Sequence, residues 1–223
     1  MSFAVAIDGT VGAGKSSISR KVAQEMGYVH IDTGAMYRSV ALYCLETFID
    51  LNDEKKISKA LSDIDIEIKF VDGEQKIFLN ELDVTIEIRA EHISVGSSKV
   101  AVVKDVRKKL VEMQRKLAEH QDVIMDGRDI GTCVLPNADI KIYLTASVEE
   151  RANRRMKELI KKGENVDIEE LKKEIIERDV RDSNREESPL KQAEDAIYVD
   201  TSNMSEEKAI KYIIKLINEC KKV

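Results

Sequence analysis

The sequence predicts an α/β fold in which helices cover both faces of a parallel sheet. Short apolar segments alternate with segments of helical periodicity along most of the 223 residues, and strands joined through helices pair in parallel. A phosphate-binding pattern, G-x-x-x-x-G-K-[ST], occupies residues 9–16 directly after the first apolar segment. Ligands bind such sheets beyond the carboxyl ends of the strands. We therefore expect the loops after Asp8, Asp32 and Asp126 to meet at one site.

Five apolar segments supply the strands of this sheet. The expected strands are residues 3–8, 29–32, 123–126, 140–144 and 196–200. Apolar residues at helical spacing predict helices over residues 15–26, 34–48 and 205–221, the first of which ends at Gly27. Right-handed crossovers between parallel strands would place such helices against the sheet.

One region interrupts this alternation. Residues 64–70 alternate between apolar and charged side chains, and Asp72-Gly73 is a typical turn pair. Residues 76–79 and 83–86 are candidates for two further strands. We expect a small antiparallel sheet inserted at about residues 62–90, and the alternative is a surface hairpin without a role.

Composition and charge narrow the class of protein. Hydrophobic residues make up 43% and charged residues 35% of the chain, as in soluble globular proteins. No apolar run approaches the roughly 20 residues that span a bilayer, and the first residues lack the layout of a signal peptide. The net charge of −6 disfavours a nucleic-acid partner.

The cysteines and histidines indicate neither a disulfide framework nor a metal site. The cysteines are odd in number and far apart, so we expect reduced thiols in a cytoplasmic protein. The histidines show no metal-ligand spacing, and we interpret them as structural or surface residues. These residues are Cys44, Cys133 and Cys220, and His30, His92 and His120.

The pattern at residues 9–16 suits the binding of a nucleoside triphosphate. Glycines let successive backbone N–H groups face phosphate oxygens, and the following helix adds its partial positive charge. Lys15 would reach the β- and γ-phosphates from an exposed loop, and the Ser16 hydroxyl would bind Mg²⁺. The residues predicted to hold the ATP phosphates are Gly9, Thr10, Val11, Gly12, Ala13, Gly14, Lys15, Ser16 and Ser17.

Arginines at helical spacing favour a phosphoryl-transfer enzyme. Switch GTPases share the loop, but the patterns D-x-x-G and [NT]-K-x-D do not occur in the sequence. Arginine has a planar fork that suits phosphate groups, although solvated ion pairs are the plain alternative for such faces. The two sets, each expected on one helix face, are Arg151, Arg154 and Arg155, and Arg178, Arg181 and Arg185.

Three further segments resemble the signatures of bacterial-type cytidylate kinases. They are residues 32–38 (DTGAMYR), 126–132 (DGRDIGT) and 178–185 (RDVRDSNR). The resemblance continues through Ser98, Arg107 and residues 188–196, and it covers essentially the whole chain. One departure is Glu81 after Asn80, where the family commonly has glycine in a hairpin turn.

The resemblance implies a single P-loop kinase domain over residues 1–223. Its core would be a five-stranded parallel sheet, with a monophosphate-binding insert at about residues 62–95 and an arginine-rich lid at about residues 151–185. The enzyme would transfer the γ-phosphoryl group of ATP to CMP or dCMP with Mg²⁺. We expect a monomer that binds these substrates and neither nucleic acid nor membrane.

The resemblance also implies roles for individual side chains. Lys15 and Arg128 would act on the transferring phosphoryl group, together with lid arginines. Asp126 would hold Mg²⁺ through water, or would orient Lys15 or Ser16 instead. The predicted catalytic residues are Lys15, Arg128, Arg151, Arg155 and Arg181.

The acceptor site follows from the same resemblance. Asp129 would accept a hydrogen bond from the cytosine N4 amino group, while Arg107 and Ser98 would bind the other polar atoms of the base. Alternatively, Asp129 and Asp182 only hold neighbouring arginines, and Thr33 caps the helix expected to begin at Gly34. The predicted CMP-binding residues are Thr33, Arg38, Ser98, Arg107, Arg128, Asp129, Arg178, Asp182 and Arg185.

Two other functions remain open at this stage. One is a P-loop kinase of another small acceptor, such as UMP, AMP or shikimate. The other is a regulatory protein that binds ATP without transferring phosphate, although the arginine-rich faces have little use in a simple sensor.

Overall fold

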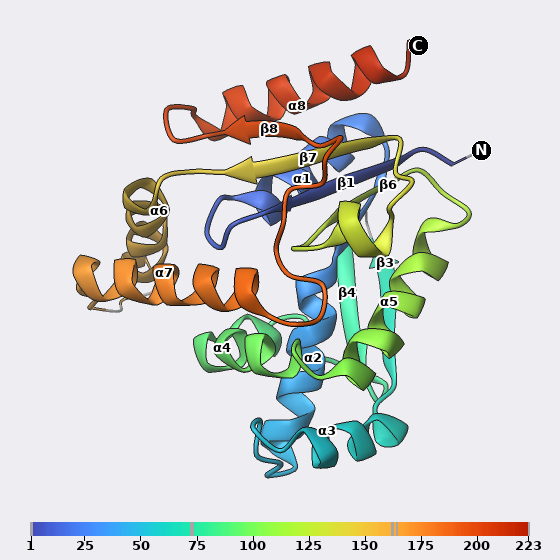
Figure 1. Ribbon diagram of the computed structural model, residues 1–223, viewed down its shortest axis with the longest axis vertical. Coiled ribbons are helices and arrows are strands. Elements are labelled where there is room, and N and C mark those ends of the chain that lie inside the picture. The colour runs from blue at the N-terminus through green and yellow to red at the C-terminus, as the bar shows by residue number, and fades with distance from the viewer. Residues whose placement is uncertain (1, 72–73, 162, 164, 223) are drawn as a thin grey trace.

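Five parallel strands form the central sheet, as the sequence predicts. The computed structural model describes residues 2–71, 74–161, 163 and 165–222. The strand order is β2-β6-β1-β7-β8, and every pair is parallel (Figure 1). The strands are β1 (Ala4–Gly9), β2 (Val29–Asp32), β6 (Val123–Asp126), β7 (Ile140–Thr145) and β8 (Ile197–Asp200).

Helices pack on both faces of this sheet. On one face α1 (Lys15–Met26) and α8 (Glu206–Cys220) bury an apolar cluster that includes Ile7, Ile124 and Ile213. On the other face α5 (Lys104–Ala118) and the short helix Ile130–Val134 cover a second cluster. Both chain ends lie at the amino side of the strands, opposite the phosphate-binding loop (Figure 1).

The interrupting region forms a separate antiparallel sheet, which confirms that prediction. It contains β3 (Ile66–Val71), β4 (Glu74–Leu79) and β5 (Leu82–Asp83) in that order; the predicted turn at residues 72–73 lies outside the described residues. The third strand ends before the predicted residues 84–86. The backbone N–H of Ile77 donates to the Thr85 hydroxyl at 2.9 Å, where a continuing strand would offer a backbone carbonyl.

A helical layer covers this small sheet and gives it a core of its own. Ile57, Ile77 and Ile88 are among its fully buried side chains. The layer comprises α2 (Thr33–Glu46), α3 (Glu54–Ala60), α4 (Glu91–Val100), α5 and the 3₁₀ turns Leu61–Asp63 and Glu87–Arg89. In Figure 1 this half of the molecule lies below the parallel sheet.

The start of α2 differs from the prediction. The helix begins at Thr33 rather than at residue 34. The Asp32 carboxylate caps it by accepting a hydrogen bond from the backbone N–H of Ala35 at 3.1 Å. The hydroxyl of Thr33 instead donates to the backbone carbonyl of Asp126 at 2.8 Å. Thr33 therefore joins β2 to β6 and is not the helix cap. At its other end α2 stops at Glu46, before the predicted residue 48.

The turn between β4 and β5 is strained at Glu81, the residue that stands where the family commonly has glycine. Asn80 has φ 47° and Glu81 has φ 69°, and a two-residue hairpin turn with both φ values positive is the type I′ turn that favours glycine at its second position.

We predict that Glu81→Gly raises the free energy of unfolding by about 1 kcal/mol, as measured by urea titration. The control is Glu67→Gly in β3, which should lower it by about 0.5–1 kcal/mol; a loss in both variants would contradict the prediction.

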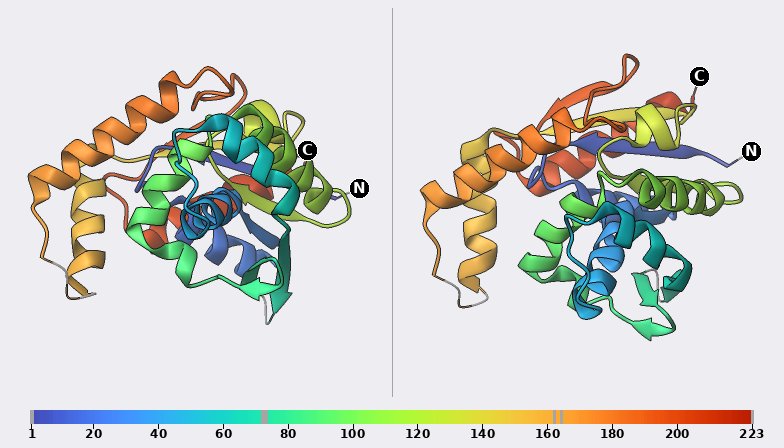
Figure 2. Two further views of the ribbon diagram at one scale, coloured as in Figure 1. Left: turned by 90° about the horizontal axis from the view of Figure 1, so that it is seen from below. Right: turned by 60° about the horizontal axis from the view of Figure 1, so that its bottom comes forward.

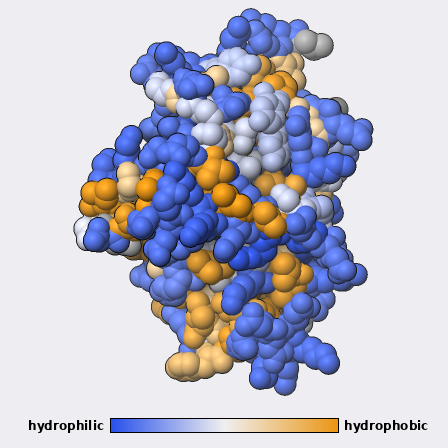
Figure 3. Space-filling model, turned by 60° about the vertical axis from the view of Figure 1, so that its left-hand side comes forward, coloured by the Kyte–Doolittle hydropathy of each residue, from blue (hydrophilic) through white to orange (hydrophobic). Residues whose placement is uncertain are grey.

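Helices α6 (Val148–Lys161) and α7 (Ile168–Asn184) form an arm at one end of the molecule (Figure 2). Ala152, Leu159, Leu171 and Ile175 form a small apolar cluster between them. Figure 3 shows a mostly hydrophilic surface on this side, with separate hydrophobic patches. No helix within the described residues is both long and apolar enough to cross a membrane.

Candidate active site

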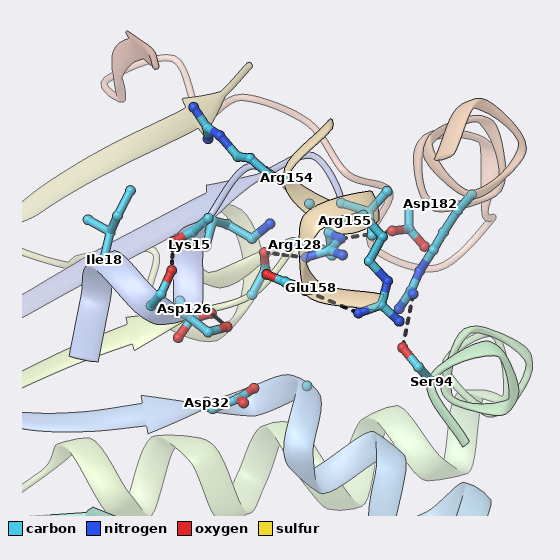
Figure 4. Close-up of a pocket in the computed structure, with 18 of the residues that line it drawn as sticks. Lys15, Ile18, Asp32, Ser94, Asp126, Arg128, Arg154, Arg155, Glu158 and Asp182 are labelled. Carbon is cyan, nitrogen blue, oxygen red and sulfur yellow. Dashed lines mark hydrogen bonds and ion pairs between the residues drawn. The ribbon is translucent and has the colours of Figure 1, made fainter. Parts of the chain in front are cut away.

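A cleft of about 810 Å³ lies beyond the carboxyl ends of the parallel strands. The structure brings the loops after Asp8, Asp32 and Asp126 together at this cleft, as the strand pattern predicts. The α4 helix and the α6–α7 arm complete its walls. Figure 4 shows part of the lining, with Arg128 between Lys15 and Asp182.

The phosphate-binding loop has the backbone conformation that its glycines allow. Gly9 has φ 147°, and a Cβ atom there would lie 1.8 Å from the backbone oxygen of Leu144, so only glycine lets β1 run this close to β7. Gly14 caps α1 with φ 87°, in the left-handed region. The loop therefore leads directly into the amino end of α1, where backbone N–H groups are free to bind anions.

Lys15 is buried rather than exposed, which corrects the sequence-based expectation. Its Nζ donates to the carbonyl oxygens of Gly9 at 2.8 Å and Thr10 at 2.6 Å. Burial, together with the positive charge of Arg128, lowers the pKa of Lys15 well below its usual value. The ammonium group thus lies inside the loop, where a bound phosphate would relieve its desolvation.

Asp126 links the loop to the sheet. Its Oδ2 accepts a hydrogen bond from the Ser16 hydroxyl at 2.7 Å, and its Oδ1 lies 2.6 Å from His30 Nε2. The Asp126 side chain is only 3% exposed. A buried carboxylate beside a hydroxyl is an oxygen donor set of the kind that Mg²⁺ prefers.

Asp32 holds two arginines at the entrance to the small sheet. Its Oδ2 accepts from Arg38 at 2.8 Å and from Arg89 at 2.9 Å. Burial alone would raise the pKa of Asp32, but the charges of the two arginines hold it well below its usual range. The side-chain oxygen of Gln75 in β4 also accepts a hydrogen bond from the backbone N–H of Asp32 at 2.8 Å, so the insert is bonded directly to this strand end.

Asp8 is the third strand-end carboxylate. Its two oxygens accept the backbone N–H groups of Ile130 and Gly131, each at 2.7 Å. Burial raises the pKa of Asp8 to about 6, although these hydrogen bonds oppose the rise.

This raised pKa predicts a measurable pH dependence of stability. The folded protein holds the Asp8 proton more tightly than the unfolded chain, so the contribution is fully present below the unfolded pKa of 3.8 and is lost as the pH rises through about 6. Relative to Asp8→Asn, the free energy of unfolding should fall by about 3 kcal/mol between pH 3.5 and 7. Urea titrations of both proteins across this range test it; parallel pH curves would contradict it.

The far end of the cleft holds a network of arginines around two carboxylates. Asp129 bonds to Arg107 and, at 3.0 Å, to Arg185. Asp182 accepts from Arg128 Nε at 2.8 Å. The charge of Arg128 holds the pKa of Asp182 below its usual value even though burial opposes this. Both carboxylates thus hold neighbouring arginines, whatever else they contact.

Arg178 extends this positively charged wall toward α4. Its Nη1 donates to the Ser94 hydroxyl at 3.1 Å, and its buried Nε has no hydrogen-bond partner among the described residues. Burial and the nearby Arg128 lower the pKa of Arg178 to about 10. An anion beside Arg178 would therefore interact with a guanidinium group whose donors are incompletely satisfied.

The arginines of the arm divide into two groups. Arg155 lines the cleft and pairs with Glu91 of α4 and with Glu158 at 3.2 Å. Arg151 is 4% exposed and donates to the carbonyl of Val11 at 2.8 Å, so it fastens the arm to the phosphate-binding loop. Arg181 is exposed. Arg151 and Arg181 lie outside the cleft lining.

Most other predicted residues do line the cleft. Of the loop, Gly9, Thr10 and Ala13 are not part of the lining. Of the acceptor set, Arg107 lies behind it and reaches it through Asp129. The predicted residues in the lining are Val11, Gly12, Gly14, Lys15, Ser16, Ser17, Thr33, Arg38, Ser98, Asp126, Arg128, Asp129, Arg155, Arg178, Asp182 and Arg185.

Sequence reasoning missed some residues of this site. Arg89 and Ser94 come from the insert and α4, where no motif marks them. Arg154 does carry a signal, because it shares a helix face with Arg155, but this spacing alone does not assign it a role in the site. It donates to the carbonyls of Ala13 at 3.2 Å and Thr201 at 2.9 Å. Ile18, Met204 and Ala209 add apolar surface to the end of the cleft that Arg154 lines.

The fold and the site together define a P-loop kinase. The sequence profile of the family described as cytidylate kinase matches residues 5–219. A cytidylate kinase of Caldicellulosiruptor bescii is 51% identical over 212 residues, which cover 95% of this chain and 94% of the relative. A cytidylate kinase of Pediococcus pentosaceus is 48% identical over 220 residues, 99% of this chain and 97% of the relative. The chain belongs to the cytidylate kinase family.

A solved structure supports the fold independently of close sequence similarity. An uncharacterized protein from Eubacterium ventriosum aligns with a TM-score of 0.55 over 97% of this chain and 98% of that chain. The two sequences are 14% identical, so this likeness concerns the fold alone.

Proposed function

We propose that this protein transfers the γ-phosphoryl group of ATP to CMP or dCMP, producing ADP and CDP or dCDP. One observation carries the proposal. A single cleft has a phosphate-binding loop at one end and a network of arginines around Asp129 and Asp182 at the other. Such a cleft suits two phosphorylated ligands facing each other, and membership of the cytidylate kinase family names them.

The donor would occupy the end formed by the loop and α8. The loop N–H groups and Lys15 would bind the triphosphate, with the amino end of α1 beneath it. The apolar surface of Ile18, Met204 and Ala209, together with Arg154, lines the same end of the cleft. This surface suits the flat face of a nucleobase.

The acceptor would occupy the end formed by α4, α7 and residues 127–129. Arg38, Arg128 and Arg185 would bind its phosphate. Asp129 still has lone pairs beyond its two arginine contacts, so it can accept from the cytosine N4 amino group. Uracil presents an oxygen at that position and would be repelled.

The chemistry requires positioning rather than a general base. The attacking oxygen belongs to a phosphate with a second pKa of about 6, so it is largely ionised at neutral pH. Arginines and Lys15 would bring the two phosphates together and neutralise their charge. A Mg²⁺ ion held by Ser16 and, through water, by Asp126 would add charge stabilisation at the β- and γ-phosphates.

The α6–α7 arm would act as the lid over residues 151–185. Its own apolar cluster allows the pair to move as one body. Arg155 would approach the transferring phosphoryl group, whereas Arg151 would transmit lid position to the loop through Val11. We assign the insert and lid to one domain, since residues of the insert, the lid and the phosphate-binding loop line the same cleft.

An acceptor panel tests this function. The protein, ATP and Mg²⁺ are incubated with CMP, dCMP, UMP, AMP or shikimate, and ADP formation is followed with each. We expect the highest kcat/KM with CMP or dCMP. A highest value with AMP or shikimate would overturn the substrate assignment, and no ADP with any acceptor would favour a non-catalytic ATP-binding protein.

A further inference from the structure

We propose that His30 is a positioning residue that holds the Asp126 carboxylate in the orientation needed to bind Mg²⁺ with ATP. The inference deepens the proposed function and rests on its assignment of Ser16 and Asp126 to the magnesium site. Of the two roles that the sequence allows for this histidine, structural or at the surface, the structure favours the first. It places His30 against the buried carboxylate that contacts the phosphate-binding loop.

The sheet register brings His30 to this position. His30 pairs with Ile124, and Asp32 pairs with Asp126, between the neighbouring strands β2 and β6. Side chains two residues apart on a strand share one face, so His30 and Asp126 lie on the same face of the sheet. Ile124 belongs to the cluster beneath α1 and α8, so this is the face that carries the loop and α1.

His30 and Ser16 divide the two oxygens of Asp126 between them. His30 Nε2 lies 2.6 Å from Oδ1, and the Ser16 hydroxyl donates to Oδ2 at 2.7 Å. A carboxylate only accepts hydrogen bonds, so Nε2 is the protonated nitrogen of the ring. The His30 side chain is 10% exposed. The histidine therefore fixes the rotation of the carboxylate from a site that solvent hardly reaches.

Loss of this contact would leave Oδ1 without a side-chain partner among the described residues. The buried carboxylate, held only by Ser16, would then be free to rotate, for example toward the Lys15 ammonium, and would no longer present a fixed oxygen toward the cleft. Outer hydrogen bonds of this kind contribute about 10–100-fold to metal affinity where the ligand binds metal directly. A water-mediated ligand should lie at the lower end of that range.

The experiment measures ATP binding by calorimetry with and without Mg²⁺, in the absence of an acceptor. The variants are His30→Phe, which keeps a planar ring but loses the donor, and His30→Gln, which keeps a donor. The control is His120→Phe, because the His120 side chain is 89% exposed. Thermal unfolding of each variant shows whether it is folded.

We expect His30→Phe to reduce the Mg²⁺-dependent gain in ATP affinity by about tenfold. Its ATP affinity without Mg²⁺ should stay within about twofold of the parent protein, because the loop itself is unchanged. His30→Gln should recover most of the gain, and His120→Phe should retain all of it. Equal losses with and without Mg²⁺, or an unchanged gain in His30→Phe, would overturn the proposal. Phosphoryl transfer is not the readout, so failure of the acceptor panel would be recognised separately.

Discussion

Lys15→Ala is expected to lower the turnover number for phosphoryl transfer by about 10³-fold, the scale found for charge-stabilising groups in such reactions. Lys15 lies within the loop, with its ammonium on the carbonyls of Gly9 and Thr10. Contacts of this kind place the charge where the β- and γ-phosphates would lie, and alanine removes it entirely. The measurement is the initial rate of ADP formation at saturating ATP and CMP.

The fold should tolerate this change. Because burial lowers the pKa of Lys15, the folded protein pays a desolvation cost for its charge that alanine removes. The thermal midpoint of Lys15→Ala should therefore not drop by more than a few degrees. Lys59→Ala, an exposed lysine on α3, is the control and should keep the parental rate. A near-parental rate in Lys15→Ala would refute the role of Lys15.

Asp129→Asn is expected to lower kcat/KM for CMP by about 10²-fold, while the affinity for ATP changes by less than about threefold. The amide keeps the size of the side chain but replaces one acceptor with a donor. The variant therefore lacks the negative charge that pairs with Arg107 and Arg185. The carboxylate oxygen that becomes an NH₂ group can no longer accept a hydrogen bond from cytosine N4. The preference for CMP over UMP should narrow as well.

A purely structural role for Asp129 would give a different result. The substitution leaves two buried arginine charges less compensated, so some loss of stability is expected in either case. Equal losses of CMP use and ATP binding, with unchanged preference for CMP over UMP, would show that Asp129 only supports the fold. Asp195→Asn is the control: Asp195 pairs with Lys141 at 2.8 Å outside the cleft and is largely exposed.

Local patterns predicted the elements of the fold well. Runs of β-branched and aliphatic residues bounded by glycine and aspartate indicate strands without reference to the rest of the chain, and five of them formed the sheet. Boundaries were less predictable, because competing side-chain bonds decide them. Asp32 rather than Thr33 caps α2, and the Thr85 hydroxyl ends the third strand of the insert.

The cleft was predicted as a meeting of loops but not in its contacts. Helical spacing put Arg151, Arg154 and Arg155 on one face, yet it could not show which of them reaches the cleft. The packing of α6 on the phosphate-binding loop decides this. Arg151 donates hydrogen bonds to the backbone carbonyls of Val11 and Ala146, while Arg155 lines the cleft. The same holds for His30, since its contact with Asp126 depends on strand register.

The sequence by itself determined the phosphate-binding loop, the parallel sheet, the inserted antiparallel strands and, through its signature segments, the family. These follow from short-range chemistry, namely backbone freedom at glycine, side-chain periodicity and the residues adjoining each strand end. The tertiary structure decided the burial of Lys15, the pairing of Asp129 with two arginines and the place of His30 behind Asp126. Those facts depend on contacts between segments far apart in the chain, and only the packed fold brings such segments together.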